Sequence, residues 1–147
     1  MTLKRKLKTT PQGEMNMGLT RIPVKLARFD SLARLDSNAT YNADFLVDTG
    51  AMDSMAPASE LRKIGIEPVG RRLYEFANGD IEEYEHGLAK VSFMNETTWT
   101  DIIFGPDDSE PILGVVTLEI AGFVVDPKNE TLRKLRARPL KQMAWAK

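Results

Sequence analysis

The stretch Phe45-Leu46-Val47-Asp48-Thr49-Gly50-Ala51 joins an apolar run directly to an acid, a hydroxyl and a glycine. The apolar side chains that precede Asp48 predict a strand that enters a hydrophobic core. A carboxylate tethered to a buried strand is costly unless the fold hydrogen-bonds it or uses it. Asp and Gly are also common turn residues, so an ordinary turn is compatible with the tripeptide alone. The apolar run before Asp48 favours a functional carboxylate.

Composition narrows the chemistry that the chain can perform. Its 147 residues suit one domain. Cysteine is absent, which excludes a disulfide framework, thiol chemistry and cysteine-based zinc sites. The chain has a single histidine, His86, so its composition does not favour a His-rich metal site or a Ser-His-Asp triad. We expect neither a metal nor a cofactor, and we expect His86 to be a solvated strand residue.

Charge is unevenly distributed although the net charge is only −1. Residues 1–10 carry four basic and no acidic residues, and residues 132–147 carry six basic and none acidic. Such basic ends can contact the acidic body, within the chain or across a dimer, or bind an anionic partner. Solvated tails are the expected arrangement for residues 1–12. The basic residues lack interleaved aromatics, so nucleic acid is not an expected partner.

No apolar stretch follows the basic residues at the start of this sequence. This pattern predicts neither a secretory signal nor a transmembrane helix, and we expect a cytoplasmic protein without a membrane partner. Residues 1–16 are expected to be a flexible polar and basic extension, 17–132 the folded domain and 133–147 a basic tail.

Local patterns predict mostly strands. Strands are expected over residues 22–27, 41–47, 98–104 and 123–125. A short helix is expected over 58–64, with Pro57 as its first residue, Leu61 and Ile64 facing inward, and Gly65 just past its end. Residues 114–121 are ambiguous, because their β-branched residues favour a strand by propensity.

Residues 71–76 and 81–93 form two extended arms around Asn78-Gly79. Asn-Gly between such arms predicts a hairpin with a type I′ turn, in which both central residues have positive φ. A second turn is expected at 95–97. An ordinary connection within a sheet is compatible with the sequence of the Asn78-Gly79 hairpin.

The opening heptapeptide resembles the active-site motif of the aspartic proteases, hydrophobic-hydrophobic-Asp-Thr-Gly-Ala, in its retropepsin form. Retropepsins comprise the retroviral proteases and their bacterial and cellular relatives. A second segment, 102–106 followed by 111–118, is similar to the family's late hydrophobic-hydrophobic-Gly block. The Asn78-Gly79 hairpin lies between these blocks, where the family carries its flap. The resemblance covers roughly residues 18–126.

The resemblance implies a mostly β fold, a closed retropepsin-like β-barrel with one or two short helices, that is half of a twofold dimer. It also implies a helix over 114–121, closed by Gly122. The chain has one Asp-Thr-Gly and no Asp-Ser-Gly, so one copy supplies half of a two-carboxylate site. A homodimer places the second Asp48 opposite the first.

The implied activity is that of an aspartic endopeptidase on a peptide or protein substrate. Asp48, Thr49 and Gly50 would form the catalytic loop, and the two Asp48 carboxylates would share one proton and activate water. The residues implied to bind substrate are Ala51, Met52, Asp53, Ala77, Asn78, Gly79 and Ile112.

Two other functions are compatible with the same residues. The first is a non-catalytic peptide-binding or scaffold dimer on the same fold, in which Asp48 is merely retained. The second is an unrelated small β-barrel whose basic tails bind nucleic acid. Trp99 and Trp145 are expected to be packing residues rather than binding platforms.

Overall fold

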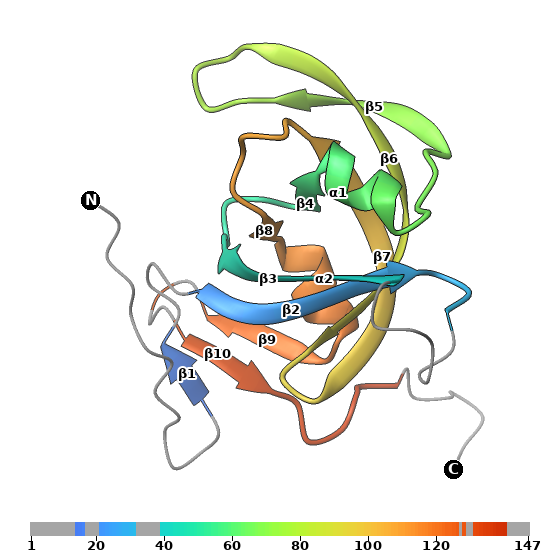
Figure 1. The fold of residues 1–147 in the computed structure, drawn as a ribbon. Coiled ribbons are helices and arrows are strands. Elements are labelled where there is room, and N and C mark those ends of the chain that lie inside the picture. Colours follow the sequence, from blue (N-terminus) through green and yellow to red (C-terminus); the bar gives the residue numbers. More distant parts are fainter. Residues whose placement is uncertain (1–13, 17–20, 32–38, 127, 129–130, 141–147) are drawn as a thin grey trace, which may run out of the picture.

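The computed structural model describes residues 14–16, 21–31, 39–126, 128 and 131–140. Within these ranges the fold is mostly β, with two short helices, as predicted (Figure 1). No helix in the described part of the chain is long and apolar enough to cross a membrane. The elements, in chain order, are β1 (Glu14–Asn16), β2 (Arg21–Arg28), β3 (Thr40–Val47), β4 (Ser54–Pro57), α1 (Ala58–Lys63), β5 (Gly70–Glu75), β6 (Ile81–Phe93), β7 (Glu96–Gly105), β8 (Ile112–Leu113), α2 (Val115–Ile120), β9 (Phe123–Asp126) and β10 (Thr131–Lys134).

Seven strands form the main sheet, in the order β2-β3-β8-β4-β7-β6-β5. Strand β2 pairs with β3 over most of its length and also with β6, from Lys25 opposite Ser92 to Arg28 opposite Ala89. The pairing therefore passes through six strands and returns to β2. The core combines strand side chains with one residue from each helix, and it includes Ile22, Val24, Leu26, Phe45, Val47, Ile102 and Leu113 of the strands, Leu61 of α1 and Leu118 of α2.

The two-residue strand β8 positions the segment that follows β3. It pairs parallel to β3, with Leu46 opposite Ile112, and antiparallel to β4, with Met55 opposite Ile112. Strand β4, which sequence patterns did not predict, runs parallel to β7. The chain between β3 and β4 is therefore anchored at both ends by buried strands.

Helix α2 resolves the ambiguity of residues 114–121 in favour of a helix. Thr117 and Leu118 are fully buried, and Gly122 follows the helix with a φ of 93°. Packing of this apolar face outweighs the strand propensity of the β-branched residues. The helix prediction from the family resemblance is thus confirmed.

Helix α1 forms close to its predicted place. Pro57 is the residue before the first helical residue rather than the first one, so this boundary was predicted one position too early. Leu61 and Ile64 are buried, and Gly65 takes a φ of 82° just past the end. The carboxylate of Asp107 accepts a hydrogen bond from the Ser59 amide at 2.9 Å, which satisfies a donor in the first turn.

The type I′ turn predicted at Asn78-Gly79 is wrong. In this turn only Gly79 has a positive φ, of 89°. The Gly79 amide donates to the Phe76 carbonyl at 2.9 Å, and this hydrogen bond closes the turn. The two consecutive positive φ values lie instead at Met94 (50°) and Asn95 (63°), between β6 and β7. These two residues join paired strands, as a type I′ turn requires.

A second sheet of three strands, in the order β1-β10-β9, changes the predicted boundaries of the domain. Glu14–Asn16 of β1 lie within the predicted extension, and β10 continues to Lys134, past the predicted boundary at 132. These residues were assigned to tails because they are polar, but backbone pairing orders them. Residues 1–13 and 141–147 of the predicted tails, with Trp145, lie outside the described residues.

Candidate functional site

Asp48 follows directly on the buried end of β3, at the start of a loop that runs to residue 53 and is named here the Asp48 loop. The Gly50 amide donates to Asp48 Oδ1 at 2.9 Å, and the Ala51 amide donates to the Asp48 carbonyl at 3.2 Å. The Asp48 amide donates to the Leu113 carbonyl of β8 at 3.1 Å. Asp48 is half-buried, whereas Thr49 and Gly50 are exposed. The carboxylate is therefore held by its own turn at a surface that a ligand can reach.

The amides at the start of α2 bind the Asp48 loop. Val115 N–H donates to the Ala51 carbonyl at 2.9 Å, and Val116 N–H donates to the Met52 carbonyl at 3.0 Å. The first amides of a helix have no partner inside the helix, so the loop supplies carbonyls that they need. A Cβ atom on Gly114 would lie 2.6 Å from the backbone carbon and oxygen of Asp53. Only glycine allows this close approach.

A buried hydroxyl cluster lies beneath the loop. Ser54 Oγ accepts from the Gly114 amide at 2.9 Å and is 2.6 Å from Thr117 Oγ1, which is 3.4 Å from Thr100 Oγ1. The three hydroxyl residues are almost fully buried. A hydroxyl can donate and accept at once, so Ser54 can bind the Gly114 amide and Thr117 together. The cluster joins three elements that are distant in sequence, β4, β7 and α2.

The remaining residues proposed from the Asp48 segment lie around this loop. Met52 keeps 71% of its surface exposed. Ile112 is half-buried in β8, beside Leu46 of β3. Ala51 is half-buried within the loop itself. These residues share the neighbourhood of Asp48.

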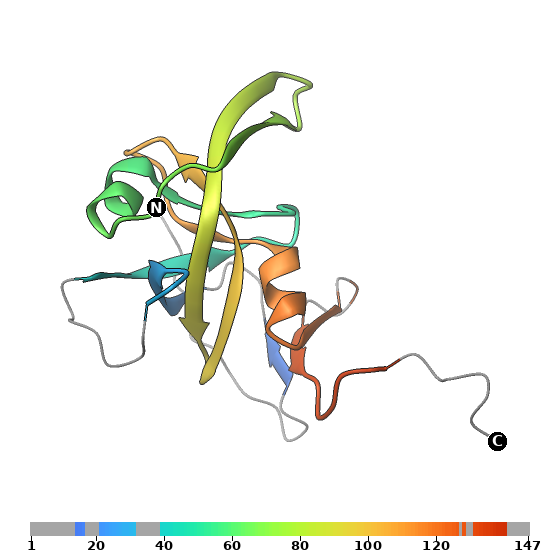
Figure 2. The ribbon, with the colours of Figure 1, turned by 90° about the vertical axis from the view of Figure 1, so that its right-hand side faces the viewer.

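The β5–β6 hairpin carries the other proposed residues, Ala77, Asn78 and Gly79, at its exposed tip. The Phe76 amide donates to the Asp80 carbonyl at 2.8 Å, and Asn78 Oδ1 accepts from the Asp80 amide at 3.0 Å. In both views the tip lies on the same side of the molecule as the Asp48 loop and above it (Figures 1 and 2). The tip itself makes no described contact with that loop.

Closer to its base, the hairpin reaches the Asp48 loop through Asp53. The Tyr74 hydroxyl donates to Asp53 Oδ2 at 2.7 Å, and Arg72 Nη1 lies 3.3 Å from the same oxygen. Arg72 Nη1 also donates to Asp101 of β7 at 3.1 Å. Burial, together with the Asp53 hydrogen bond, raises the pKa of Tyr74 to about 12, so the phenol stays a donor at any physiological pH.

The same cluster includes His86, for which solvation was predicted. That prediction is wrong, because the His86 side chain is only 14% exposed and its Nδ1 lies 2.9 Å from Asp101 Oδ1. Hydrogen bonds to Tyr74 and Asp101 raise the pKa of Arg72 above its ordinary value. Asp101 thus holds an imidazole with one oxygen and a guanidinium with the other.

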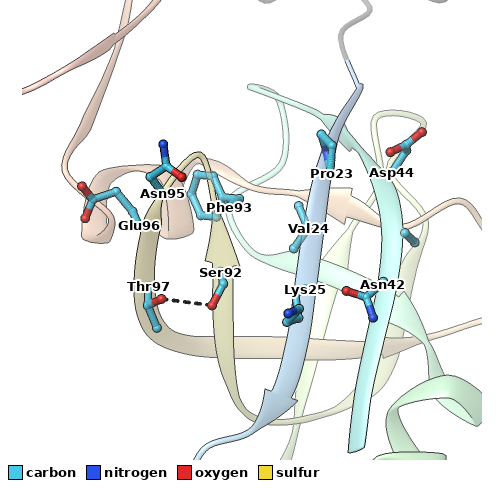
Figure 3. A pocket seen from close by; sticks show the side chains of 11 residues that line it. Pro23, Val24, Lys25, Asn42, Asp44, Ser92, Phe93, Asn95, Glu96 and Thr97 are labelled. Atoms are coloured by element: carbon cyan, nitrogen blue, oxygen red, sulfur yellow. Dashed lines mark hydrogen bonds between the residues drawn. The ribbon is translucent and has the colours of Figure 1, made fainter. Parts of the chain in front are cut away.

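A groove of about 740 Å³ lies elsewhere, where β6 leaves β2 beyond the Lys25–Ser92 pair (Figure 3). Its walls are the edges of β2 and β3 and the turn between β6 and β7, with the Ser92 and Thr97 hydroxyls 3.0 Å apart. None of the residues proposed for catalysis or substrate binding lines this groove. The candidate site is therefore the exposed Asp48 loop with the hairpin, not this groove.

Two further features bear on other kinds of site. The described residues contain no cluster of histidine, aspartate or glutamate arranged to hold a metal ion. Trp99 is 53% exposed, and its indole N–H donates to the Phe29 carbonyl at 2.8 Å. Trp99 therefore lies on the surface of the sheet rather than in the core.

Comparison with known proteins gives a likeness among solved structures. No protein-family model matches the chain, and no curated protein matches it. Among solved structures, the chain is similar to the crystal structure of a retropepsin-like aspartic protease from Rickettsia conorii, with a TM-score of 0.44 and 17% sequence identity. The likeness covers 86% of this chain and 85% of that chain.

Proposed function

We propose that this chain is an aspartic endopeptidase whose active form is a homodimer on a closed, retropepsin-like barrel. The observation that carries the proposal is the Asp48 loop. It presents a carboxylate that accepts the Gly50 amide at 2.9 Å, at the end of a buried strand. Three further amides hold the surrounding backbone. The Val115 and Val116 amides of α2 donate to carbonyls of the loop, and the Gly114 amide donates to Ser54 Oγ. Such a preorganised acid is what carboxylate catalysis requires.

The chemistry uses two carboxyl groups and one water molecule. Two carboxyls about 3 Å apart share one proton, because like charges at that distance cannot both ionise. The ionised member takes a proton from water as the water oxygen bonds to the scissile carbonyl carbon. The protonated member hydrogen-bonds to the carbonyl oxygen and stabilises its developing charge. Proton transfer to the amide nitrogen then allows the C–N bond to break, which gives an acid and an amine.

One chain offers one such loop, so the second carboxyl comes from a second copy. In an isologous dimer the twofold axis passes between the two copies of Asp48. Thr49, exposed next to Asp48, is the residue that would meet its counterpart across this axis. Gly50 keeps the backbone close to the carboxylate, where a Cβ atom would lie 3.2 Å from Asp48 Oδ1.

The β5–β6 hairpin is the flap of this proposal. An extended peptide would lie between its tip and the Asp48 loop, with Met52, Asp53 and Ile112 beneath it. Closure of the hairpin excludes water and offers backbone hydrogen bonds to the peptide. Activity that depends on one shared proton falls on both sides of an acidic to near-neutral optimum.

The test is cleavage of a diverse peptide library at several acidic and near-neutral pH values. Asp48→Asn should lower cleavage by about 10²–10⁴-fold, because it removes the general base and acid. Asp44→Asn is the matched control, since it changes an exposed acid of the same strand. Sedimentation should show that both variants dimerise like the wild type.

Wild-type protein that binds peptides without cutting them would favour a peptide-binding scaffold and contradict the proposal. Cleavage that survives in Asp48→Asn would also contradict the proposal, because it would show that another group does the chemistry. Loss of cleavage on addition of a metal chelator would contradict it too. A salt-dependent complex with DNA or RNA in place of cleavage would indicate a nucleic-acid-binding protein.

A further inference from the structure

The β5–β6 hairpin has few links to the rest of the described chain, and they stop well short of its tip. Every described hydrogen bond of residues 75–84 stays within the hairpin. At the base, Glu85 pairs with Arg62 of α1 at 2.9 Å. Further out, the last links to the body are those of Arg72 and Tyr74 to Asp53 and Asp101.

The partner of these outermost links is part of the Asp48 loop itself. Asp53 immediately precedes β4, and its side chain is only 12% exposed. The backbone of Gly114 packs closely against Asp53, since a Cβ atom on Gly114 would lie 2.6 Å from the backbone carbon and oxygen of Asp53. The hairpin is thus tied to the end of the Asp48 loop that packs against Gly114.

The alternation along β5 explains why these two side chains reach Asp53. Arg72 and Tyr74 are two residues apart, so they lie on the same face of the strand. Arg71 and Leu73 lie on the opposite, exposed face, where Arg71 pairs with Glu83 inside the hairpin. Tyr84, opposite Arg72, uses its hydroxyl within its own strand, on Glu82 at 2.6 Å.

We propose that Tyr74, Arg72 and Asp53 form a latch that sets the position of the hairpin over the Asp48 loop. Tyr74 and Arg72 are then positioning residues for peptide binding, an inference that rests on the proposed endopeptidase function. With the latch made, the hairpin stays near the loop and closes readily on a peptide. With the latch broken, the hairpin spends more time away from the loop. Part of the free energy of peptide binding is then used to bring the hairpin back, so the apparent affinity falls.

The experiment compares two latch variants with two matched controls. Tyr74→Phe removes one hydroxyl from the latch, and Tyr84→Phe removes one from the same hairpin outside the latch. Arg72→Gln removes one latch charge, and Arg71→Gln removes the neighbouring charge on the other face. Amide hydrogen exchange of residues 70–85 is measured on the full-length dimer, and KM and kcat are measured with one cleaved peptide.

The latch variants should exchange the hairpin amides at least about threefold faster than wild type, because local opening becomes easier. Their KM should rise about tenfold, the factor that corresponds to losing one hydrogen bond to a charged group, with kcat little changed. Both controls should match the wild type in exchange and in KM. A structural role in folding alone would not separate KM from kcat in this way.

Hairpin exchange in Tyr74→Phe and Arg72→Gln equal to wild type would overturn the latch. Faster exchange with an unchanged KM would overturn the positioning role, and faster exchange in the controls would show that the effect is not specific. If the wild type cleaves no peptide, the proposed function fails, and the exchange comparison by itself still decides whether the latch exists.

Discussion

The Asp48 loop and the tip of the β5–β6 hairpin face the same side of the molecule but are held in opposite ways. The loop is held by the Leu113 carbonyl of β8 and by two amides of α2, and it lies above a buried hydroxyl cluster. The tip is exposed and bonded only to itself among the described residues. Catalytic groups need fixed geometry, whereas a segment that admits a substrate needs low local stability. Under the proposed function, this difference fits chemistry at the loop and peptide binding at the hairpin.

Gly114→Ala should have the largest effect on stability and cleavage, because it changes the contact that packs α2 against the Asp48 loop. The added Cβ would lie 2.6 Å from the Asp53 backbone, which cannot yield as a flexible side chain would. We expect a loss of about 2–4 kcal/mol in unfolding free energy from overpacking and strain, with cleavage nearly abolished. Denaturant unfolding measures the unfolding free energy, and a peptide assay measures cleavage. A variant with wild-type stability and wild-type cleavage would show that the loop is not held by this close approach.

Ser54→Ala should come next. It leaves the Gly114 amide without its acceptor and removes the partner of Thr117, at a cost of about 1–3 kcal/mol. Ser92→Ala is the matched control, because it breaks a hydroxyl pair with Thr97 at the surface. The control should change stability by less than about 0.5 kcal/mol. Equal losses of unfolding free energy in the two variants would mean that the buried hydroxyl cluster stabilises the protein no more than a surface hydroxyl pair does.

Gly79→Val tests the other side of the comparison. No atom lies within 4 Å of a Cβ placed on Gly79, so a clash does not arise, but a β-branched residue tolerates a φ of 89° poorly. Turnover should fall about tenfold with a stability loss of only about 1–2 kcal/mol. Gly79→Asn, which adopts positive φ more readily, should retain most turnover. Wild-type turnover in a folded Gly79→Val variant would show that the hairpin is only a connection within the sheet.

Asp107→Ala should have the smallest effect and leave cleavage unchanged. The Ser59 amide holds the pKa of Asp107 below its ordinary value, so the stabilisation is complete above the unfolded-state pKa. It is lost as pH falls through the lower, folded-state pKa. The melting temperature should therefore drop by a few degrees at neutral pH, and the difference from wild type should vanish in strong acid. A difference that persists in acid would contradict this origin.

Strands β2 and β3 and the place of Asp48 could be predicted because they depend on local patterns. Alternation along β2 and the apolar end of β3 place their side chains without knowledge of the rest of the chain. Helix α2 could not be predicted by propensity alone, since its β-branched residues favour a strand. The resemblance in the segment around Gly114 supplied that assignment.

The contacts that hold the site together could not be predicted. Ser54 and Thr117 are 63 residues apart, and Arg72 meets Asp101 across 29 residues. Such pairs depend on strand register and on the curvature of the whole sheet. His86 was misjudged for the same reason, because its partner Asp101 faces it only once β6 and β7 are paired. The turn at Asn78-Gly79 was misjudged because it closes from the Gly79 amide to the Phe76 carbonyl, one residue earlier than expected, with only Gly79 at positive φ.

The central claim is that each catalytic site needs Asp48 from two copies of the chain, and subunit mixing tests it most directly. A fixed amount of wild-type protein is mixed with increasing Asp48→Asn protein, allowed to exchange subunits, and assayed for peptide cleavage. Because mixed dimers would hold only one intact carboxyl, activity should fall to about half at equal amounts and continue toward zero with excess variant. Asp44→Asn protein that lacks this inhibitory effect is the control. Activity that stays proportional to the wild-type protein alone would show that one Asp48 suffices, and would contradict the account.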